Sequence, residues 1–200
     1  MLTVGFDLDM TLVDSAPGIR TSMNALAQET GVPIDVDVVI ARIGPKLESE
    51  LAQWFPADQV EHMAERYRTH YWDNCVGDGT LLLPGARSAV KAVHDRGGRA
   101  VLVTAKSEAL AVRCVGSVGI QVDAVVGHVH GDEKRDALIE HAAGIYVGDT
   151  VTDIKSALDA SAIAVGVSTG PDDARALLAA GADLVLDSLD EFPAWLATVA

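Results

Sequence analysis

Short apolar runs alternate with helical segments along most of the chain, and this alternation constrains the fold more than any other feature. Short runs rich in Val, Ile, Leu and Ala suit strands buried on both faces, and they occur at residues 2–6, 99–104, 122–126, 144–148, 162–167 and 182–186. Helical segments are expected at residues 86–95, 107–118, 135–141, 151–160, 172–180 and 189–199. Strands and helices that alternate in this way predict an α/β fold with a doubly wound parallel sheet.

One region breaks the alternation. Between Ser15 and about Asn74 no buried strand is expected, and amphipathic helices are predicted at residues 20–29, 35–43, 47–55 and 59–72. We therefore expect a main domain formed by residues 1–14 and 80–200, with a helical insertion at residues 15–79. The insertion holds most of the aromatic residues, which we expect to form its own core rather than a substrate cage: Trp54, Phe55, Tyr67, Tyr71 and Trp72.

The composition excludes several classes of protein. Fifteen basic and 29 acidic side chains give a net charge of −14, which argues against binding to nucleic acid or to an anionic membrane. Cys75 and Cys114 are too few for a disulfide framework or a four-cysteine zinc site. No targeting segment or apolar run of membrane-spanning length is visible, so we expect a soluble cytoplasmic protein.

The first acidic motif is DLDMT, which directly follows the first expected strand. Asp7 and Asp9 stand two positions apart, so at the end of an extended strand their side chains can face the same way. The carboxyl ends of parallel strands line the ligand crevice of an α/β sheet, and two carboxylates confined there repel each other. A divalent cation such as Mg²⁺, which prefers oxygen ligands, would remove that repulsion. The alternative is that these residues only cap a loop.

The second acidic motif, GDTVTD, follows the fourth expected strand and opens a helix. Asp149 and Asp153 lie one helical turn apart, so both can face the crevice. The alternative is an ordinary helix start, where the helix dipole favours acidic side chains.

Hydroxyl and lysine side chains occur at two further strand ends. In VLVTAKS, Thr104 ends a strand and Ser107 can begin a helix, which suits either an anion site or an ordinary helix cap. In GDEKRDAL, we place Lys134 just before a helix, where it is either functional or a surface lysine.

These motifs together resemble the haloacid dehalogenase-like (HAD) hydrolase superfamily, and in particular its phosphoglycolate phosphatase-like members. The four motifs of that superfamily occur in order as DLDMT, the strand-end Thr104, Lys134 and GDTVTD. The likeness extends to FDLDMTLVDS, to LPGA near Pro84 and to VGVSTGPDDARALLAAGADLVLDSL, and so covers nearly the whole chain. It implies a Rossmann-like catalytic core with a small α-helical cap inserted after the first strand.

The resemblance also implies a Mg²⁺-dependent phosphatase that acts on a small phosphorylated metabolite similar to phosphoglycolate. Asp7 would be the nucleophile that forms an aspartyl phosphate, and Asp9 would be the general acid and base. Mg²⁺ would be held by Asp7, by the backbone carbonyl of Asp9 and by Asp149, with Asp153 in support. Phosphate oxygens would contact Thr104, the amide of Ala105 and Lys134. In the cap, we expect Arg42 and Lys46 to contact the substrate; otherwise they are solvated helix ends.

Three positions depart from the family's usual pattern, and several alternatives stay open. Met10 stands where the family usually has Gly, Ala105 where Asn is common, and Arg135 where Pro is frequent. The motifs do not distinguish a phosphatase from a phosphomutase similar to β-phosphoglucomutase. A phosphonate-cleaving enzyme that uses Lys46 is a minor option, and a dehalogenase would not need the metal-binding acids. The assembly is expected to be a monomer or a homodimer.

Overall fold

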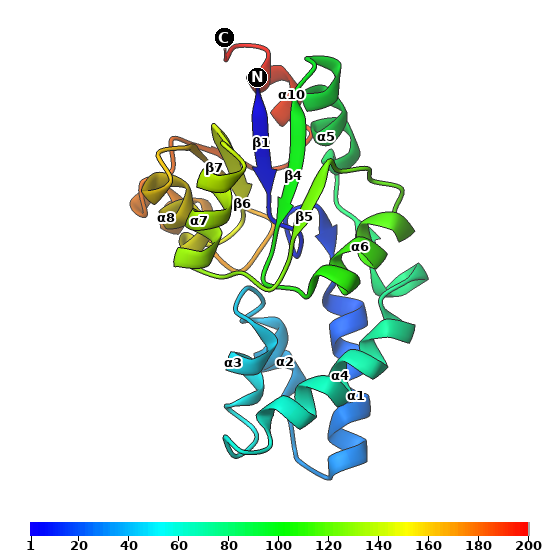
Figure 1. Ribbon diagram of the computed structural model, residues 1–200. Helices are drawn as coiled ribbons and strands as arrows, with labels where there is room; N and C mark the ends of the chain where they lie inside the picture. The colour runs from blue at the N-terminus through cyan, green and yellow to red at the C-terminus, as the bar shows by residue number, and fades with distance from the viewer. Residues whose placement is uncertain (200) are drawn as a thin grey trace.

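A six-stranded sheet forms the centre of the larger part of the molecule in the computed structural model, which describes residues 1–199 (Figure 1). All neighbouring strands are parallel, in the order β5-β4-β1-β6-β7-β8. The strands are β1 (Thr3–Phe6), β4 (Arg99–Val103), β5 (Ala124–Val126), β6 (Ile145–Gly148), β7 (Ile163–Val167) and β8 (Leu184–Leu186). Each lies within one of the expected apolar runs, and the predicted doubly wound α/β fold is confirmed.

The central strand β1 pairs with β4 on one side and with β6 on the other. Val4 is in register with Ala100 and with Ile145, and every residue of β1 is buried. After β5 the chain crosses back over the sheet to β6, so the winding direction reverses about β1. Such a reversal opens a crevice at the carboxyl ends of the flanking strands, and here these are β1, β4 and β6.

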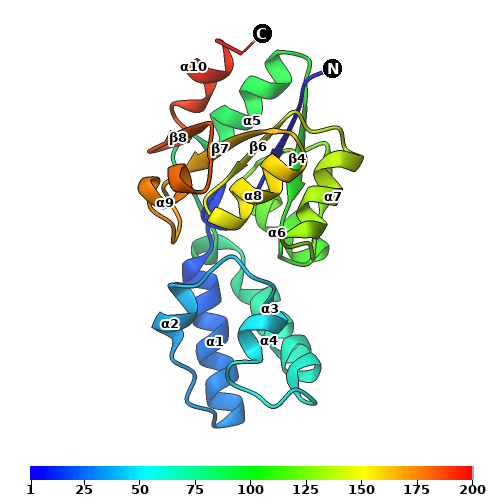
Figure 2. The same ribbon diagram turned by 90° about the vertical axis from the view of Figure 1, so that its left-hand side faces the viewer.

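Two layers of helices cover the sheet, one on each face (Figure 2). One layer consists of α5 (Ala86–Asp95), α6 (Glu108–Ser117) and α10 (Phe192–Leu196). The other consists of α7 (Asp132–Glu140), α8 (Val151–Asp159) and α9 (Ala174–Ala179). Each layer has its own buried cluster, with Phe6 packed edge-on against Phe192 in the first and Tyr146 packed with Leu138 in the second.

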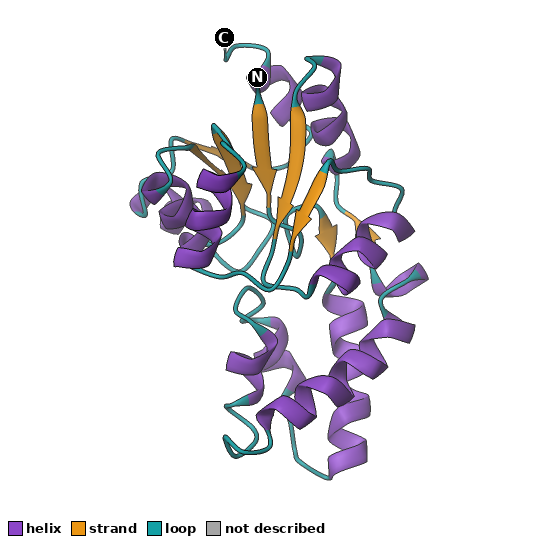
Figure 3. Cartoon of the chain, viewed as in Figure 1, coloured by secondary structure: helices purple, strands orange, loops and turns teal. Residues whose placement is uncertain are grey.

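A separate group of helices, which we call the helical unit, lies beyond the carboxyl edge of the sheet (Figures 1 and 3). It comprises α1 (Ala16–Thr30), α2 (Val36–Ile40), α3 (Leu47–Leu51) and α4 (Val60–Asn74), with α1 packed along α4. Tyr67 and Tyr71 of α4 are buried and stacked, with ring centroids 5.6 Å apart. Trp72 is instead 44% exposed and lies beneath the guanidinium of Arg113, so the expected aromatic core does not include it.

A short antiparallel ladder marks where the chain enters and leaves the helical unit. Strands β2 (Val13–Asp14) and β3 (Leu81–Leu82) pair here, and the 3₁₀ turn η1 (Gly77–Gly79) precedes β3. Two-residue strands carry no periodic pattern, so the sequence did not predict them. A Cβ on Gly79 would lie 1.6 Å from the carbonyl oxygen of Asn74, so this close crossing requires glycine.

Several helices differ from their predicted bounds, as when α1 begins at Ala16 rather than at 20 and α3 ends at Leu51 rather than at 55, and for two others the reason is identifiable. Helix α7 begins at Asp132 rather than at 135, because the Arg135 amide donates a hydrogen bond to the Gly131 carbonyl (3.2 Å), which a proline could not do. Lys134 therefore lies inside the first turn of α7 and not before it. Helix α10 is shorter than the predicted 189–199, with Pro193 in its first turn.

None of the helices within residues 1–199 is both long and apolar enough to cross a membrane.

Candidate active site

The predicted acidic and hydroxyl side chains meet at the carboxyl edge of the sheet. Asp7 follows β1, Thr104 follows β4 and Asp149 follows β6, and these three strands are neighbours. The ladder continues beyond the strand ends, because the Asp7 amide donates to the Val147 carbonyl (2.9 Å). The parallel register thus brings together groups that are far apart in the sequence.

Three of the carboxylates form one buried group. Asp7, Asp149 and Asp153 each offer an oxygen that lies within 4.8 Å of the others, and the exposed fractions of the three residues are 4%, 1% and 1%. Burial raises the pKa of Asp7 to about 7, against the opposing effect of the nearby Lys134. Burial also raises the pKa of Asp149 well above its ordinary range, and the charges of Asp7 and Asp153 add to the rise. The three carboxyl groups therefore lie where too little positive charge is present to balance them all in the ionised form.

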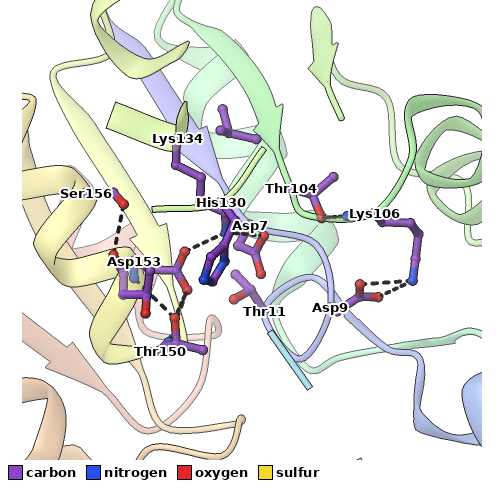
Figure 4. Close-up of polar contacts among 12 residues, drawn as sticks. Asp7, Asp9, Thr11, Thr104, Lys106, His130, Lys134, Thr150, Asp153 and Ser156 are labelled. Carbon is purple, nitrogen blue, oxygen red and sulfur yellow. Dashed lines mark hydrogen bonds and ion pairs between the residues drawn. The ribbon is translucent and has the colours of Figure 1, made fainter. Parts of the chain in front are cut away.

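A lysine partly balances these acids. Lys134 donates hydrogen bonds to Asp7 Oδ1 (2.8 Å) and to Asp153 Oδ1 (2.6 Å), and its side chain is 3% exposed (Figure 4). Burial alone would raise the pKa of Asp153, but Lys134 and further hydrogen bonds hold it below its usual value. Lys134 is therefore a structural partner of two acids as well as a candidate phosphate ligand.

Asp153 also takes part in the N-terminal cap of helix α8, a contact that the helix-dipole alternative did not specify. Thr150 and Asp153 form a capping box, in which the Thr150 hydroxyl accepts from the Asp153 amide (3.1 Å). The Tyr146 hydroxyl lies 3.1 Å from Asp153 Oδ1 and adds a further contact from β6. These contacts fix the Asp153 carboxylate beside Lys134. The Asp153 side chain thus belongs both to the N-terminal cap of helix α8 and to the buried acidic group.

The donor set fits a hard divalent cation. Thr11 donates to Asp149 Oδ1 (2.6 Å), but Asp149 Oδ2 is buried with no hydrogen-bond partner within residues 1–199. A Cβ on Gly170 would lie 1.8 Å from that oxygen, so the backbone approaches it as closely as only glycine allows. Three clustered carboxylates, two of them bonded to Lys134 and one with an oxygen left without a partner, are oxygen ligands of the kind that a hard divalent cation such as Mg²⁺ prefers.

Asp9 points away from the other three acids. Both of its oxygens accept from Lys106 Nζ, at 2.8 and 2.9 Å, and the Asp9 side chain is 14% exposed (Figure 4). Lys106 Nζ also lies 3.2 Å from the Tyr71 hydroxyl and 4.6 Å from the centre of its ring. This contact joins the sheet edge to helix α4 of the helical unit.

Sequence reasoning missed Lys106, although a signal was present. It stands two residues after the strand-end Thr104, at the same edge of the sheet where Lys134 was selected. Its partners could not be read from the sequence, because Tyr71 belongs to the inserted helices. His130 was also not predicted as a site residue; its ring lies beside the acidic group (Figure 4), and burial and Lys134 lower its pKa.

Thr104 and Ala105, the expected phosphate contacts, line the cleft. The Thr104 hydroxyl is buried and accepts from the Lys106 amide (3.2 Å). Ser107 stands at the start of α6 without a capping hydrogen bond from its side chain, so the ordinary helix cap is not formed.

The cleft lies between the helical unit and the sheet edge. Its walls carry two of the four predicted acids, Asp7 and Asp9, together with aliphatic, aromatic and charged residues: Asp7, Asp9, Ile19, Met23, Val39, Arg42, Ile43, Gly44, Pro45, Leu47, Glu48, Glu50, Tyr67, Arg68, Tyr71, Thr104, Ala105, Lys106, Ser107 and Leu110. Arg42 lines the cleft and donates to Glu50 (2.7 Å), while Arg68 pairs with Glu48. Lys46 is not among the lining residues; it pairs with Glu133 of α7 (2.6 Å) and so links the helical unit to the core.

Known proteins share this sequence pattern and fold. A sequence model described as haloacid dehalogenase-like hydrolase matches residues 4–167. The phosphoglycolate phosphatase of Chromobacterium violaceum is 28% identical over 94% of this chain and 93% of its own length. The plasmid phosphoglycolate phosphatase of Cupriavidus necator is 30% identical over 95% of this chain and 90% of its own. The crystal structure of a predicted phosphatase from Clostridium acetobutylicum has a TM-score of 0.85, with 22% identity over 98% of each chain.

Proposed function

The chain belongs to the haloacid dehalogenase-like hydrolase family and is a phosphatase, and from this premise we propose that it hydrolyses a small phosphomonoester similar to phosphoglycolate. The proposed reaction depends on Mg²⁺ and passes through a phosphorylated Asp7. One observation carries the proposal: the buried group of Asp7, Asp149 and Asp153 around Lys134, with Asp9 two residues away at the wall of the cleft. The relatives named as phosphoglycolate phosphatases supply the substrate class.

Asp7 is the proposed nucleophile. It lines the cleft at the end of β1, and Lys134 binds its Oδ1, which leaves the carboxylate oriented by one fixed hydrogen bond. Attack of a carboxylate oxygen on phosphorus forms an acyl phosphate as the bond between phosphorus and the ester oxygen breaks. Water then hydrolyses the acyl phosphate and regenerates Asp7.

Asp9 is the proposed proton donor and acceptor. Its carboxyl also lines the cleft, but it is directed toward Lys106 and not into the group of acids that holds Asp7. A carboxyl near the phosphoryl group but not bonded to it can give a proton to the leaving oxygen and later take one from the attacking water.

Asp7, Asp149 and the backbone carbonyl of Asp9 would hold Mg²⁺, with Asp153 supporting the site. The free Oδ2 of Asp149 and the raised pKa values of Asp7 and Asp149 support this assignment. When bound, the ion supplies positive charge that offsets the carboxylates and the phosphoryl oxygens. The hydroxyl of Thr104, the amide of Ala105 and the ammonium of Lys134 would bind the remaining phosphoryl oxygens.

We assign residues 15–79 as a cap over a catalytic core of residues 1–14 and 80–200. The cleft between them encloses the proposed nucleophile, and a closed cleft excludes bulk water from an acyl phosphate. Arg42 lines that cleft and is the better candidate for substrate contact in the cap, whereas Lys46 serves to hold the cap against α7.

The test is a phosphate-release assay with Mg²⁺ over a panel of small phosphomonoesters, combined with analysis of the organic product. We expect free phosphate from phosphoglycolate-like esters, and Asp7→Asn to lower kcat/KM by at least about 10⁴-fold. Asp58→Asn, a change at an exposed aspartate of the helical unit, is the matched control and should leave the rate unchanged. An isomerised phosphate ester without phosphate release would instead identify a phosphomutase, and full activity of Asp7→Asn would overturn the proposal.

A further inference from the structure

The hydroxyl of Tyr146, on strand β6, lies between two parts of the site that belong to different elements. It is 3.0 Å from the carbonyl oxygen of Val103 on β4 and 3.1 Å from Asp153 Oδ1 on α8. Tyr146 is buried, so bulk water does not replace either contact. The proposed reaction uses no phenol, so these contacts of a buried hydroxyl require another explanation.

Both partners of the hydroxyl are acceptors. A carbonyl and a carboxylate accept hydrogen bonds but do not donate them, so the Tyr146 hydroxyl is the donor in each contact. It has one proton, which the two oxygens must share. Moving either oxygen away would leave a buried acceptor with a poorer contact, and such losses are costly in the protein interior. The shared donor therefore holds the Val103 carbonyl and the Asp153 carboxylate at a set separation.

Strand β1 leaves room for the tyrosine ring because it has glycine at the crossing point. Gly5 is in register with Tyr146 on one side and with Val101 of β4 on the other. A Cβ on Gly5 would lie 2.8 Å from Cδ2 of Tyr146 and 2.8 Å from Cδ2 of Leu138, which is closer than packed atoms approach. The ring thus crosses the central strand at Gly5, and the hydroxyl reaches Val103 on the far side of it.

One end of this link is the strand that carries two proposed phosphate contacts. Val103 is the last residue of β4, and Thr104 and Ala105 follow it directly. The Val103 carbonyl shares a planar peptide unit with the Thr104 amide, so a contact that holds this carbonyl also orients the Thr104 backbone. The Tyr146 hydroxyl therefore acts on the strand end where a phosphoryl group would bind.

The other end of the link is the acid that holds Lys134. The Lys134 ammonium donates to Asp153 Oδ1 (2.6 Å), the oxygen that also accepts from Tyr146, and its Nζ lies 5.7 Å from the centre of the Tyr146 ring (Figure 4). Asp7 and Asp153 take two of the three N–H groups of this ammonium within residues 1–199, which leaves one for a phosphoryl oxygen. The direction of that N–H depends on where Asp153 is held.

The remaining hydrogen bonds of Asp153 do not provide a link to β4. Asp153 Oδ2 accepts from the amide (3.2 Å) and the hydroxyl (2.6 Å) of Thr150, which belong to the cap of α8. These contacts orient the carboxylate relative to its own helix. The Tyr146 hydroxyl orients it relative to the strand, so loss of that hydroxyl should leave the helix cap intact.

We propose that Tyr146 is a positioning residue for phosphoryl transfer, which holds Asp153 and Lys134 at a set distance from the end of β4. This inference rests on the proposed function. The proposed phosphoryl contacts come from the loop after β4 and from helix α7, and the transition state must meet both at once. An error of about 1 Å in such a separation can cost about 100-fold in rate. Without the hydroxyl, Thr104 and Lys134 are still present, but their separation is no longer fixed.

The test is Tyr146→Phe, which keeps the ring and removes the hydroxyl. With Mg²⁺ and an aryl phosphate, we expect kcat to fall by about 10–100-fold while KM changes by less than about 3-fold. Ser22→Ala is the matched control, because it removes a buried hydroxyl that donates to the Gly18 carbonyl (2.8 Å) within α1, and it should leave kcat unchanged. In metal-free protein, each variant should lower Tm by about 2–6 °C.

Orthovanadate supplies a second readout, because it mimics the five-coordinate phosphorus of the transition state. A residue that positions transition-state contacts affects such a mimic more than it affects a ground-state ligand. We expect Tyr146→Phe to weaken inhibition by vanadate by about the same factor as it lowers kcat/KM. Inhibition by inorganic phosphate should weaken by less than about 3-fold.

Gly5→Ala tests the link from the other side, because the added methyl group must displace the ring. We expect kcat to fall, and Tyr146→Phe to lower it by less than about 2-fold more in this background, since the hydroxyl is already out of place. Multiplied losses in the double variant would contradict the placement of the hydroxyl by the crossing at Gly5.

The other outcomes overturn the inference. An unchanged kcat in Tyr146→Phe would mean that the site keeps its geometry without the hydroxyl. Equal weakening of vanadate and phosphate inhibition, or a loss of Tm far beyond that of Ser22→Ala, would mean that the hydroxyl supports the fold and not the reaction. A wild-type protein that releases no phosphate from any ester would refute the proposed function and this inference with it.

Discussion

The two lysines of the site, Lys134 and Lys106, differ in the number of acidic side chains around them and in where those acids lie. Lys134 lies between Asp7 and Asp153 in a group that contains more acids than bases and is buried within the core. Lys106 pairs with one carboxylate, Asp9, at a contact shared between the core and the helical unit. The first arrangement holds a fixed excess of negative charge, as a metal site requires. The second is a pair of one positive and one negative charge.

The largest effect should come from the acidic group. Asp149→Asn removes a carboxylate from it, and we expect kcat/KM to fall by about 10³-fold or more. In metal-free protein the same change should raise the free energy of unfolding by about 1–2 kcal/mol, because one buried negative charge is lost. Thermal unfolding with and without Mg²⁺ supplies a second readout: the ion should stabilise the wild type but not the variant. Equal stabilisation of both proteins would exclude Asp149 as a ligand.

The next comparison is between Lys134→Met and Lys106→Met in urea unfolding without metal. Lys134→Met leaves two buried acids without a cation and should cost about 3–5 kcal/mol. Lys106→Met leaves only Asp9, which is 14% exposed and can regain water, so its cost should be about 1 kcal/mol. Similar losses in the free energy of unfolding for the two variants would show that Lys134 and Lys106 balance buried negative charge to the same extent.

The pH dependence of stability should separate the regions further. The pKa of Asp7 is raised from 3.8 to about 7, so between these values the folded protein holds a proton that the unfolded chain has released. The contribution of Asp7 to stability therefore falls as pH rises through this window, and Asp149 acts in the same direction. The free energy of unfolding of the metal-free Asp7→Asn variant should fall less steeply with rising pH than that of the metal-free wild type. An identical slope would contradict the raised pKa.

The smallest effect is expected at Met10, in the loop between Asp9 and Thr11. Met10 has a positive φ of 60°, which costs a residue with a Cβ more than it costs glycine. Met10→Gly should raise the free energy of unfolding by about 0.5 kcal/mol after the entropy of the unfolded glycine is included. The Thr169 hydroxyl, which donates to the Met10 carbonyl (2.5 Å), holds the loop in either case. A clear loss of stability would show that the Met10 side chain contributes packing there.

The parts of the site that the sequence predicted are those that follow from strand ends. Buried parallel strands are continuous apolar runs, so the sequence alone places Asp7, Thr104 and Asp149 at one edge of the sheet. Contacts between distant segments could not be placed in this way. The Lys106–Tyr71 contact depends on how α4 lies against the sheet, which no local pattern specifies.

Local chemistry explains most of the remaining differences. Helix α7 begins three residues earlier than predicted, because Arg135 supplies an amide at a position where proline is frequent in the family. The positive φ at Met10 explains why glycine suits that position, but no pattern in the sequence specifies the angle. The ion pair of Lys46, which was expected to contact substrate, could not be predicted either, because its partner Glu133 belongs to a helix of the core far along the chain.

The most direct test of the reaction through Asp7 uses the Asp9→Asn variant with Mg²⁺ and an aryl phosphate, whose leaving group needs no proton. The side-chain amide of this variant cannot take a proton from water, so the phosphorylated enzyme should accumulate. After acid quenching and proteolysis, we expect mass spectrometry to find one phosphoryl group, located on Asp7. Turnover by this variant at the wild-type rate, or a phosphoryl group on any other residue, would contradict the proposed mechanism.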